Sequence, residues 1–244
     1  MKLGIINGWE EGNIKYVSDK GLEAVEFCVN HNYNSAEFLA KAPDIKGYCE
    51  KYNVIVGSMG RWGMKRIDDN GEIIPEALQD DKNIIYGASI IGCPVFNCGV
   101  NYTESKSFYE NCQIAIKYLS QLIEYAKEKN VKISVYNCSW ENFVVEPKAW
   151  YPVLSALPEL GIKYDASHCL SRGGDYLSEI MKKSHEYPQL SKDEFVEITN
   201  NYLSTKEWVL PSEKACFYTY GVNYSAYIIE DVYLFSLNAY VNTD

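Results

Sequence analysis

The chain has 244 residues, of which 47% are apolar, and it carries a formal net charge of −10. One α/β barrel typically needs about 250 residues, and the charged fraction of 23% is close to the globular average of about 25%, which argues against disorder. The negative charge argues against a nucleic-acid backbone as the main partner, because phosphates would be repelled.

The cysteine pattern and the apolar runs bear on the cellular compartment. Eight cysteines are spread along the chain, and none forms a CxxC pair with zinc-ligand spacing. The first six residues form a short apolar run that polar residues follow at once, which is not typical of a secretory signal. No stretch of about 20 apolar residues predicts a membrane span. We therefore expect a cytoplasmic protein with reduced, mostly buried thiols and no membrane partner.

Short apolar runs alternate with helical patterns through the first two thirds of the chain. Most of these runs are nearly continuous, which is typical of parallel strands covered on both faces. The predicted strands are Lys2–Asn7, Leu22–Phe27, Val54–Gly57, Pro94–Gly99, Val131–Tyr136 and Ile162–Asp165. The predicted helices are Asn13–Lys20, Ser35–Tyr52, Pro75–Ile91, Thr103–Lys129 and Glu146–Leu160. Thr103 is the expected N-cap of the fourth helix, and Pro43 is expected to interrupt or kink the second.

Six β-then-α units in a row favour a parallel architecture with right-handed crossovers. The competing fold is a doubly wound open sheet, which normally has a Gly-rich phosphate-binding turn after its first strand. The segment Gly8-Trp9-Glu10-Glu11-Gly12 matches neither GxGxxG nor a P-loop. We therefore predict a (β/α) TIM barrel.

The strand-helix alternation ends at about residue 185, and the following segment is rich in tyrosine. Within it, Ala215–Tyr220 and Val232–Tyr240 have strand-like content, and Asp193–Leu203 has a short helical pattern. No Pro, Gly or Ser linker marks a domain boundary. The prediction is one barrel domain over residues 1–244, with β/α units over 1–185 and a divergent tail over 186–244.

Reactive side chains of a barrel lie at the C-terminal ends of its strands. The sixth predicted strand ends in Asp165, and His168 follows three residues later. A carboxylate and an imidazole at this spacing can bind Mn²⁺, Co²⁺ or Zn²⁺, or a polyol. Alternatively, Asp165 caps the following turn and His168 is an ordinary surface histidine.

Glu26 ends the second predicted strand after an apolar run, and burying its carboxylate is costly unless it binds something. Alternatively, it is half-buried and pairs with a lysine or arginine. Arg61 and Arg172 can hold a phosphate or carboxylate, although a solvated arginine is more frequent. No GxSxG motif occurs, and the spacing pairs no cysteine with a histidine.

Aromatic residues follow several predicted strands. Trp9, Trp62 and Trp140 can form an apolar wall against a sugar ring, although tryptophans at strand ends more often belong to the core. Asn137 follows the fifth strand and is a further candidate for substrate binding.

Three segments together resemble the xylose isomerase-like TIM-barrel superfamily, which comprises sugar phosphate isomerases and epimerases and the family 2 AP endonucleases. They are Gly21–Phe27, Val131–Asn137 and Gly161–His168, with a further similarity over Ser171–Tyr176, and the resemblance covers about residues 1–185. It implies a divalent metal (Mn, Mg, Co or Zn) held by Glu, Asp, His and Glu from strands five to eight. By this resemblance, Asp165 and His168 are metal ligands, and Glu26 and His168 are catalytic.

The sequence also departs from the family pattern. Tyr136 and Asn137 occupy the place of the strand-five glutamate, no histidine follows His185, and Glu230 lies in a context that does not match the last ligand. Two explanations are open. The tail is a divergent closure of the barrel, or the reading frame has shifted within residues 184–187.

The resemblance implies a sugar or sugar-phosphate isomerase or epimerase that moves a proton or hydride with the help of a metal. The expected substrate is a small sugar or polyol, bound by Trp9, Asn137, Trp140 and Arg172. The alternative is a catalytically impaired or truncated barrel that binds a sugar without turnover. Metal-dependent DNA repair of the AP endonuclease type is disfavoured by the charge of −10.

Overall fold

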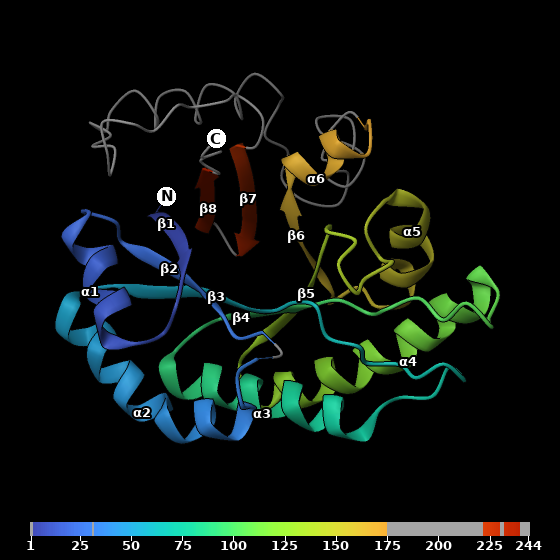
Figure 1. The fold of residues 1–244 in the computed structure, drawn as a ribbon, viewed down its shortest axis with the longest axis horizontal. Coiled ribbons are helices and arrows are strands. Elements are labelled where there is room, and N and C mark those ends of the chain that lie inside the picture. Colours follow the sequence, from blue (N-terminus) through green and yellow to red (C-terminus); the bar gives the residue numbers. More distant parts are fainter. Residues whose placement is uncertain (1, 31, 175–221, 230–231, 240–244) are drawn as a thin grey trace.

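The computed structural model describes residues 2–30, 32–174, 222–229 and 232–239 (Figure 1). Six parallel strands alternate with helices along the chain. The strands are β1 (Lys2–Asn7), β2 (Ala24–Cys28), β3 (Ile55–Arg61), β4 (Val95–Cys98), β5 (Lys132–Tyr136) and β6 (Gly161–Asp165). The helices are α1 (Glu11–Asp19), α2 (Ser35–Tyr52), α3 (Pro75–Ile91), α4 (Phe108–Lys127), α5 (Pro147–Ala156) and α6 (Ala166–Ser171).

The strands form a closed barrel in sequence order. An antiparallel hairpin of β7 (Val222–Ile229) and β8 (Val232–Ala239) completes it. β7 pairs antiparallel with β6, and β8 pairs parallel with β1 (Figure 1). The barrel with six β/α units is thus confirmed, as is the divergence of its C-terminal part, because a regular (β/α)₈ barrel has eight parallel strands.

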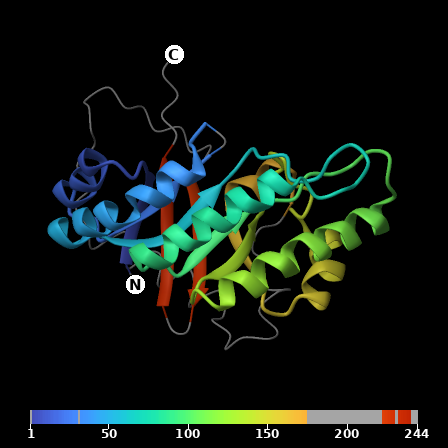
Figure 2. The same cartoon turned by 90° about the horizontal axis from the view of Figure 1, so that it is seen from below.

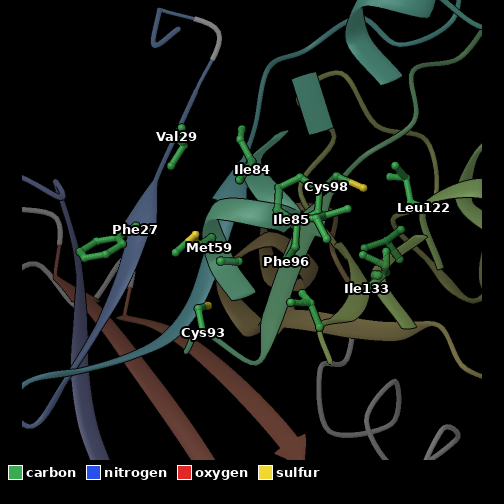
Figure 3. Packing of buried hydrophobic residues seen from close by; sticks show 14 of the residues in the cluster. Phe27, Val29, Met59, Ile84, Ile85, Cys93, Phe96, Cys98, Leu122 and Ile133 are labelled. Carbon is green, nitrogen blue, oxygen red and sulfur yellow. The ribbon is translucent and has the colours of Figure 1, made fainter. Parts of the chain in front are cut away.

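The helices cover the outside of the barrel. Figure 2 shows α2, α3 and α4 side by side against the strands. Apolar side chains on the outer faces of the strands, among them Phe27, Met59 and Phe96, are fully buried together with Ile84 and Ile85 of α3 (Figure 3). This core fixes the strand order and leaves the inward-facing residues to form the site.

The predicted bounds of α4 need a correction. α4 begins at Phe108 and not near Thr103, because Ser107 and Glu110 form a capping box. Ser107 Oγ accepts a hydrogen bond from the Glu110 backbone, and the Glu110 carboxylate accepts one from the Ser107 backbone. Pro43 does not interrupt α2, which spans the predicted Ser35–Tyr52.

The described C-terminal strands bear on part of the predicted tail. The strand expected at Val232–Tyr240 matches β8, whereas β7 was not predicted. The expected strand Ala215–Tyr220, the expected helix Asp193–Leu203 and the boundary at residue 185 lie outside the described residues.

Buried charges tie the loop after β3 to the helices. The Arg66 guanidinium donates to both carboxylate oxygens of Asp81, at 2.7 and 3.2 Å, and the Tyr118 hydroxyl donates to the same carboxylate at 2.7 Å. Arg61 is also buried and donates to Asp80 at 3.1 Å. Arg61 therefore serves this network and is not placed to hold an anionic ligand.

Two further features concern the compartment. The seven cysteines of the described segments are free thiols, and Cys28 and Cys138 are the two that are not fully buried. None of the described helices combines the length and apolar composition that crossing a membrane requires.

Candidate active site at the mouth of the barrel

The C-terminal ends of β5 and β6 are joined by one side chain. Asn137 Nδ2 donates to the backbone carbonyl of Asp165 at 2.8 Å, and the Asp165 backbone N–H donates to Asn137 Oδ1 at 2.8 Å. Arg172 Nη1 donates to the backbone carbonyl of Asn137 at 2.8 Å. The Asn137 amide thus positions Asp165, and Arg172 is held beside both strand ends.

Asp165 divides its two carboxylate oxygens between two tasks. Oδ1 accepts hydrogen bonds from the backbone N–H and the hydroxyl of Ser167, at 2.9 and 2.7 Å, and so caps α6. Oδ2 lies 3.6 Å from Nε2 of His168. The capping geometry that the sequence left open as an alternative is therefore present, together with a contact between carboxylate and imidazole.

His168 also forms a side-chain hydrogen bond with Cys138, which follows β5. This bond raises the pKa of His168 above its ordinary value of 6.5, and the charge of Asp165 adds to it, whereas burial opposes it. Burial is the largest effect on Cys138 and raises the thiol pKa, but the hydrogen bond with His168, a backbone hydrogen bond at Trp140 and the charge of His168 together leave it below 9.0. The His168 side chain remains 34% exposed, so a ligand at the mouth can reach it. We call Asn137, Cys138, Asp165, His168 and Arg172 the mouth cluster.

A second polar group lies inside the barrel. The Glu26 carboxylate is almost fully buried and accepts a hydrogen bond from Asn97 Nδ2 at 2.8 Å and one from Lys163 Nζ at 2.6 Å. These three residues come from β2, β4 and β6, and alternate strands supply one layer of side chains in such barrels. We call Glu26, Asn97 and Lys163 the charged layer.

Trp62 covers the charged layer. Its ring centroid lies 4.2 Å from Lys163 Nζ, which is a cation–π contact, and its Nε1 donates to Asn97 Oδ1 at 2.8 Å. A side chain at Gly60 would overlap the Trp62 ring, so glycine at this position allows the indole to lie there.

The structure brings together four residues that the sequence proposed separately, namely Asn137, Asp165, His168 and Arg172. Glu26 belongs instead to the charged layer. Its partner Lys163 lies on β6, two residues before Asp165.

The two tryptophans proposed as substrate contacts lie in different surroundings. Trp140 is 52% exposed, its ring lies against Gly63, and its carbonyl accepts a hydrogen bond from the Tyr136 hydroxyl at 2.7 Å. Trp9 is buried and packs edge-on against Tyr33 and Phe38. Trp140 is thus available to a ligand, whereas Trp9 has the surroundings of a core residue.

Sequence reasoning missed Lys163 and Cys138. Lys163 lies two residues before Asp165 on β6, and this period of two places both side chains on the same face of the strand. Cys138 and His168 follow the ends of two adjacent strands, so the barrel order brings them together. The spacing along the chain does not show this pairing.

The resemblance implies a divalent metal, which needs several donor atoms that converge on one point. Within the described segments, no three His, Cys, Asp or Glu side chains converge as metal ligands would. Asp165 and His168 supply two donors, one Asp165 oxygen is taken by the α6 cap, and Tyr136 and Asn137 supply no carboxylate from β5. The described residues alone therefore do not supply the three protein ligands that are typical of a catalytic zinc site.

A family model described as xylose isomerase-like TIM barrel matches residues 14–201, which is more than half of the chain. The chain belongs to the xylose isomerase-like TIM barrel family. A search of curated protein sequences finds no match to this chain.

Solved structures share the fold at low sequence identity. They include 3-keto-D-glucoside 4-epimerase from E. coli, with a TM-score of 0.61, 12% identity and coverage of 75% of this chain and 74% of that one. A D-tagatose 3-epimerase-like protein gives a TM-score of 0.59 at 17% identity, over 76% of this chain and 72% of that one. The probable 3-DHS dehydratase AsbF from Bacillus anthracis gives 0.57 at 10% identity, over 75% and 69%. The names of these structures indicate different chemistries, and at this level of identity the likeness concerns the fold alone.

Proposed function

We propose that this member of the xylose isomerase-like family is an isomerase or epimerase of a small sugar, free or phosphorylated, that acts at the mouth cluster. The supporting observation is the 3.6 Å contact between Asp165 Oδ2 and a partly exposed His168, at the end of the barrel where sites of this fold lie. The epimerases among the structures of the same fold agree with this class of reaction.

A proton shift between adjacent carbons needs a base at carbon and an acid at oxygen. His168 is suited to be the acid, because its raised pKa increases the protonated fraction near neutral pH. The carboxylate of Asp165 is suited to be the base, through the oxygen that does not cap α6.

The proposed reaction balances without a co-reactant. Asp165 takes the proton from the carbon beside the carbonyl while His168 protonates the carbonyl oxygen, which gives an enediol. Asp165 then delivers the proton to the former carbonyl carbon, and His168 recovers its proton from the hydroxyl on the carbon that was first deprotonated, where the new carbonyl forms. The other members of the mouth cluster position these two groups.

The remaining predicted site residues receive roles according to their surroundings. Trp140 offers an exposed ring against which a sugar can stack. Both carboxylate oxygens of Glu26 accept hydrogen bonds from protein side chains, so its role in this proposal is to hold Lys163 and Asn97. A direct catalytic role for Glu26 requires its pair with Lys163 to open.

Product formation tests the proposal. The full chain would be incubated with a panel of aldoses and ketoses, free and phosphorylated, and new sugars followed by NMR. We expect turnover of at least one sugar, and a loss of about 10²-fold or more in His168→Ala and in Asp165→Asn. Lys127→Met, which changes an exposed ion pair with Glu159, is the control and should keep full activity. Equal turnover in wild type and His168→Ala would overturn the proposal.

One observation favours a second candidate, a barrel that binds a sugar without turnover. β5 ends in Tyr136 and Asn137 follows it, and the Asn137 amide is used by the backbone of Asp165, so these two positions supply no carboxylate. Calorimetry separates the two candidates. A sugar that binds to the wild type, loses affinity in Trp140→Ala and is recovered unchanged supports the binder.

A further inference from the structure

Two serine hydroxyls inside the barrel have no hydrogen-bond partner among the described residues. The Oγ atoms of Ser58 on β3 and Ser134 on β5 are inaccessible to solvent, and within the part of the chain that the structure describes neither bonds to a protein atom. A buried hydroxyl without a partner costs about 1–3 kcal/mol. Native proteins satisfy nearly all such groups with protein or ordered water.

Strand register places Ser58 just below the charged layer. β3 pairs Ser58 with Glu26 on one side and Gly60 with Asn97 on the other. Because Glu26 and Asn97 contact each other at one level, β3 crosses that level between Ser58 and Gly60. Ser58 is therefore the inward residue on the N-terminal side of the charged layer, and Gly60 the one on the mouth side.

β5 places Ser134 at the corresponding level. Ser134 pairs with Asn97, and Tyr136 pairs with Lys163. Asn97 and Lys163 share the level of the charged layer, since both donate to Glu26. Ser134 therefore lies on the N-terminal side of that level, as Ser58 does.

β1 contributes no side chain to this level. Ile6 pairs with Glu26, just as Tyr136 pairs with Lys163. The residue of β1 that corresponds to Ser134, two positions toward the N-terminal end of the strand, is therefore Gly4. We call Gly4, Ser58 and Ser134 the serine layer. Barrel interiors of this fold are normally filled by Val, Ile and Leu, whereas these three positions carry two hydroxyls and no apolar side chain.

We propose that the serine layer binds ordered water, which hydrogen-bonds to the hydroxyls of Ser58 and Ser134. Water is the ligand class that matches this site, because each hydroxyl can both donate and accept, and because the Glu26–Lys163 pair directly above is already balanced in charge. The same water solvates the charged layer from below. It thereby reduces the desolvation cost of keeping an ion pair in the barrel interior.

Alanine substitutions separate a hydrated layer from a dry one. Removing a hydroxyl that binds water loses a hydrogen bond, whereas removing an unpaired hydroxyl relieves a penalty. We expect Ser58→Ala and Ser134→Ala each to lower the melting temperature of the full chain by about 2–4 °C. Their combination should lower it by less than the sum, because both hydroxyls bind the same water. Ser120→Ala on α4, where the hydroxyl bonds to its own helix near the surface, is the matched control.

A crystal structure of the full chain supplies the second readout. Electron density for water within hydrogen-bond distance of Ser58 Oγ and Ser134 Oγ, absent from the double alanine variant, supports the proposal. A serine layer without water density, together with a rise in melting temperature in both single variants, overturns it.

Discussion

Lys163 Nζ lies 2.6 Å from Glu26 Oε2 across the barrel, although 137 residues separate the two along the chain. Both side chains are more than nine-tenths buried, and each charge compensates the other. The pair joins β2 to β6, and β6 also carries Asp165 of the mouth cluster. The ion pair therefore supports the strand on which the proposed chemistry depends.

Breaking this ion pair from one side should be costly. In Lys163→Met the Glu26 carboxylate is left buried without its cation, and we expect the free energy of unfolding to fall by roughly 3–5 kcal/mol in urea titrations. The double variant Glu26→Gln/Lys163→Met should recover a large part of this loss, because no unpaired charge remains. Lys127→Met, in an exposed ion pair, should change stability by less than about 1 kcal/mol. A Lys163→Met protein as stable as wild type would show that the pair does not form.

The hydrogen bond with His168 should make Cys138 the most reactive thiol of the described segments. A lowered pKa increases the thiolate fraction, whereas burial raises the pKa of Cys28 to about 11. With iodoacetamide at neutral pH, mass spectrometry should show Cys138 alkylated before Cys28, which is an internal control of similar exposure. In His168→Ala the alkylation of Cys138 should slow, by about tenfold for each unit that its pKa rises. Unchanged alkylation in that variant would contradict the contact.

His168 should also make stability depend on pH. Its pKa is higher in the folded state than its ordinary value of 6.5, so its contribution is complete below pH 6.5 and is lost as the pH rises through the folded pKa. The difference in unfolding free energy between wild type and His168→Ala should therefore be larger at pH 5.5 than at pH 9. The comparison removes any packing effect of the substitution that does not vary with pH. A difference of the same size at both ends would argue against a raised pKa.

The capping box of α4 gives a test of local structure. Ser107→Ala should destabilise the protein by about 1 kcal/mol, because a backbone N–H at the start of α4 loses its acceptor. Ser107→Asp keeps an acceptor at the same place and should restore most of the loss. If Ser107→Ala unfolds at the same urea concentration as wild type, the helix does not begin where the capping box places it.

The sequence predicted the barrel because its parallel strands are continuous apolar runs, which local patterning reveals. It did not predict the charged layer, because the partners Glu26 and Lys163 meet only through the strand order and the stagger of a closed barrel. The contact between Cys138 and His168 depends on the same long-range order. The start of α4 was placed too early because Thr103 is also a good capping residue, and only the reciprocal bonds of Ser107 and Glu110 distinguish the two.

The metal ligands that the resemblance implies remain a prediction. Asp165 and His168 follow the family motif, yet the local capping of α6 uses one Asp165 oxygen. A motif predicts where two residues lie along the chain, but it does not predict which hydrogen bonds their side chains form.

The central claim is that Asp165 and His168 move a proton on a small sugar, and hydrogen exchange tests it most directly. The full chain would be incubated in D₂O with the sugar panel, and ¹H NMR would follow the proton on the carbon beside the carbonyl. The account predicts loss of that signal for at least one sugar, with exchange retained in Lys127→Met and abolished in both His168→Ala and Asp165→Asn. A panel in which no sugar exchanges, or exchange that persists in both variants of the mouth cluster, would contradict it.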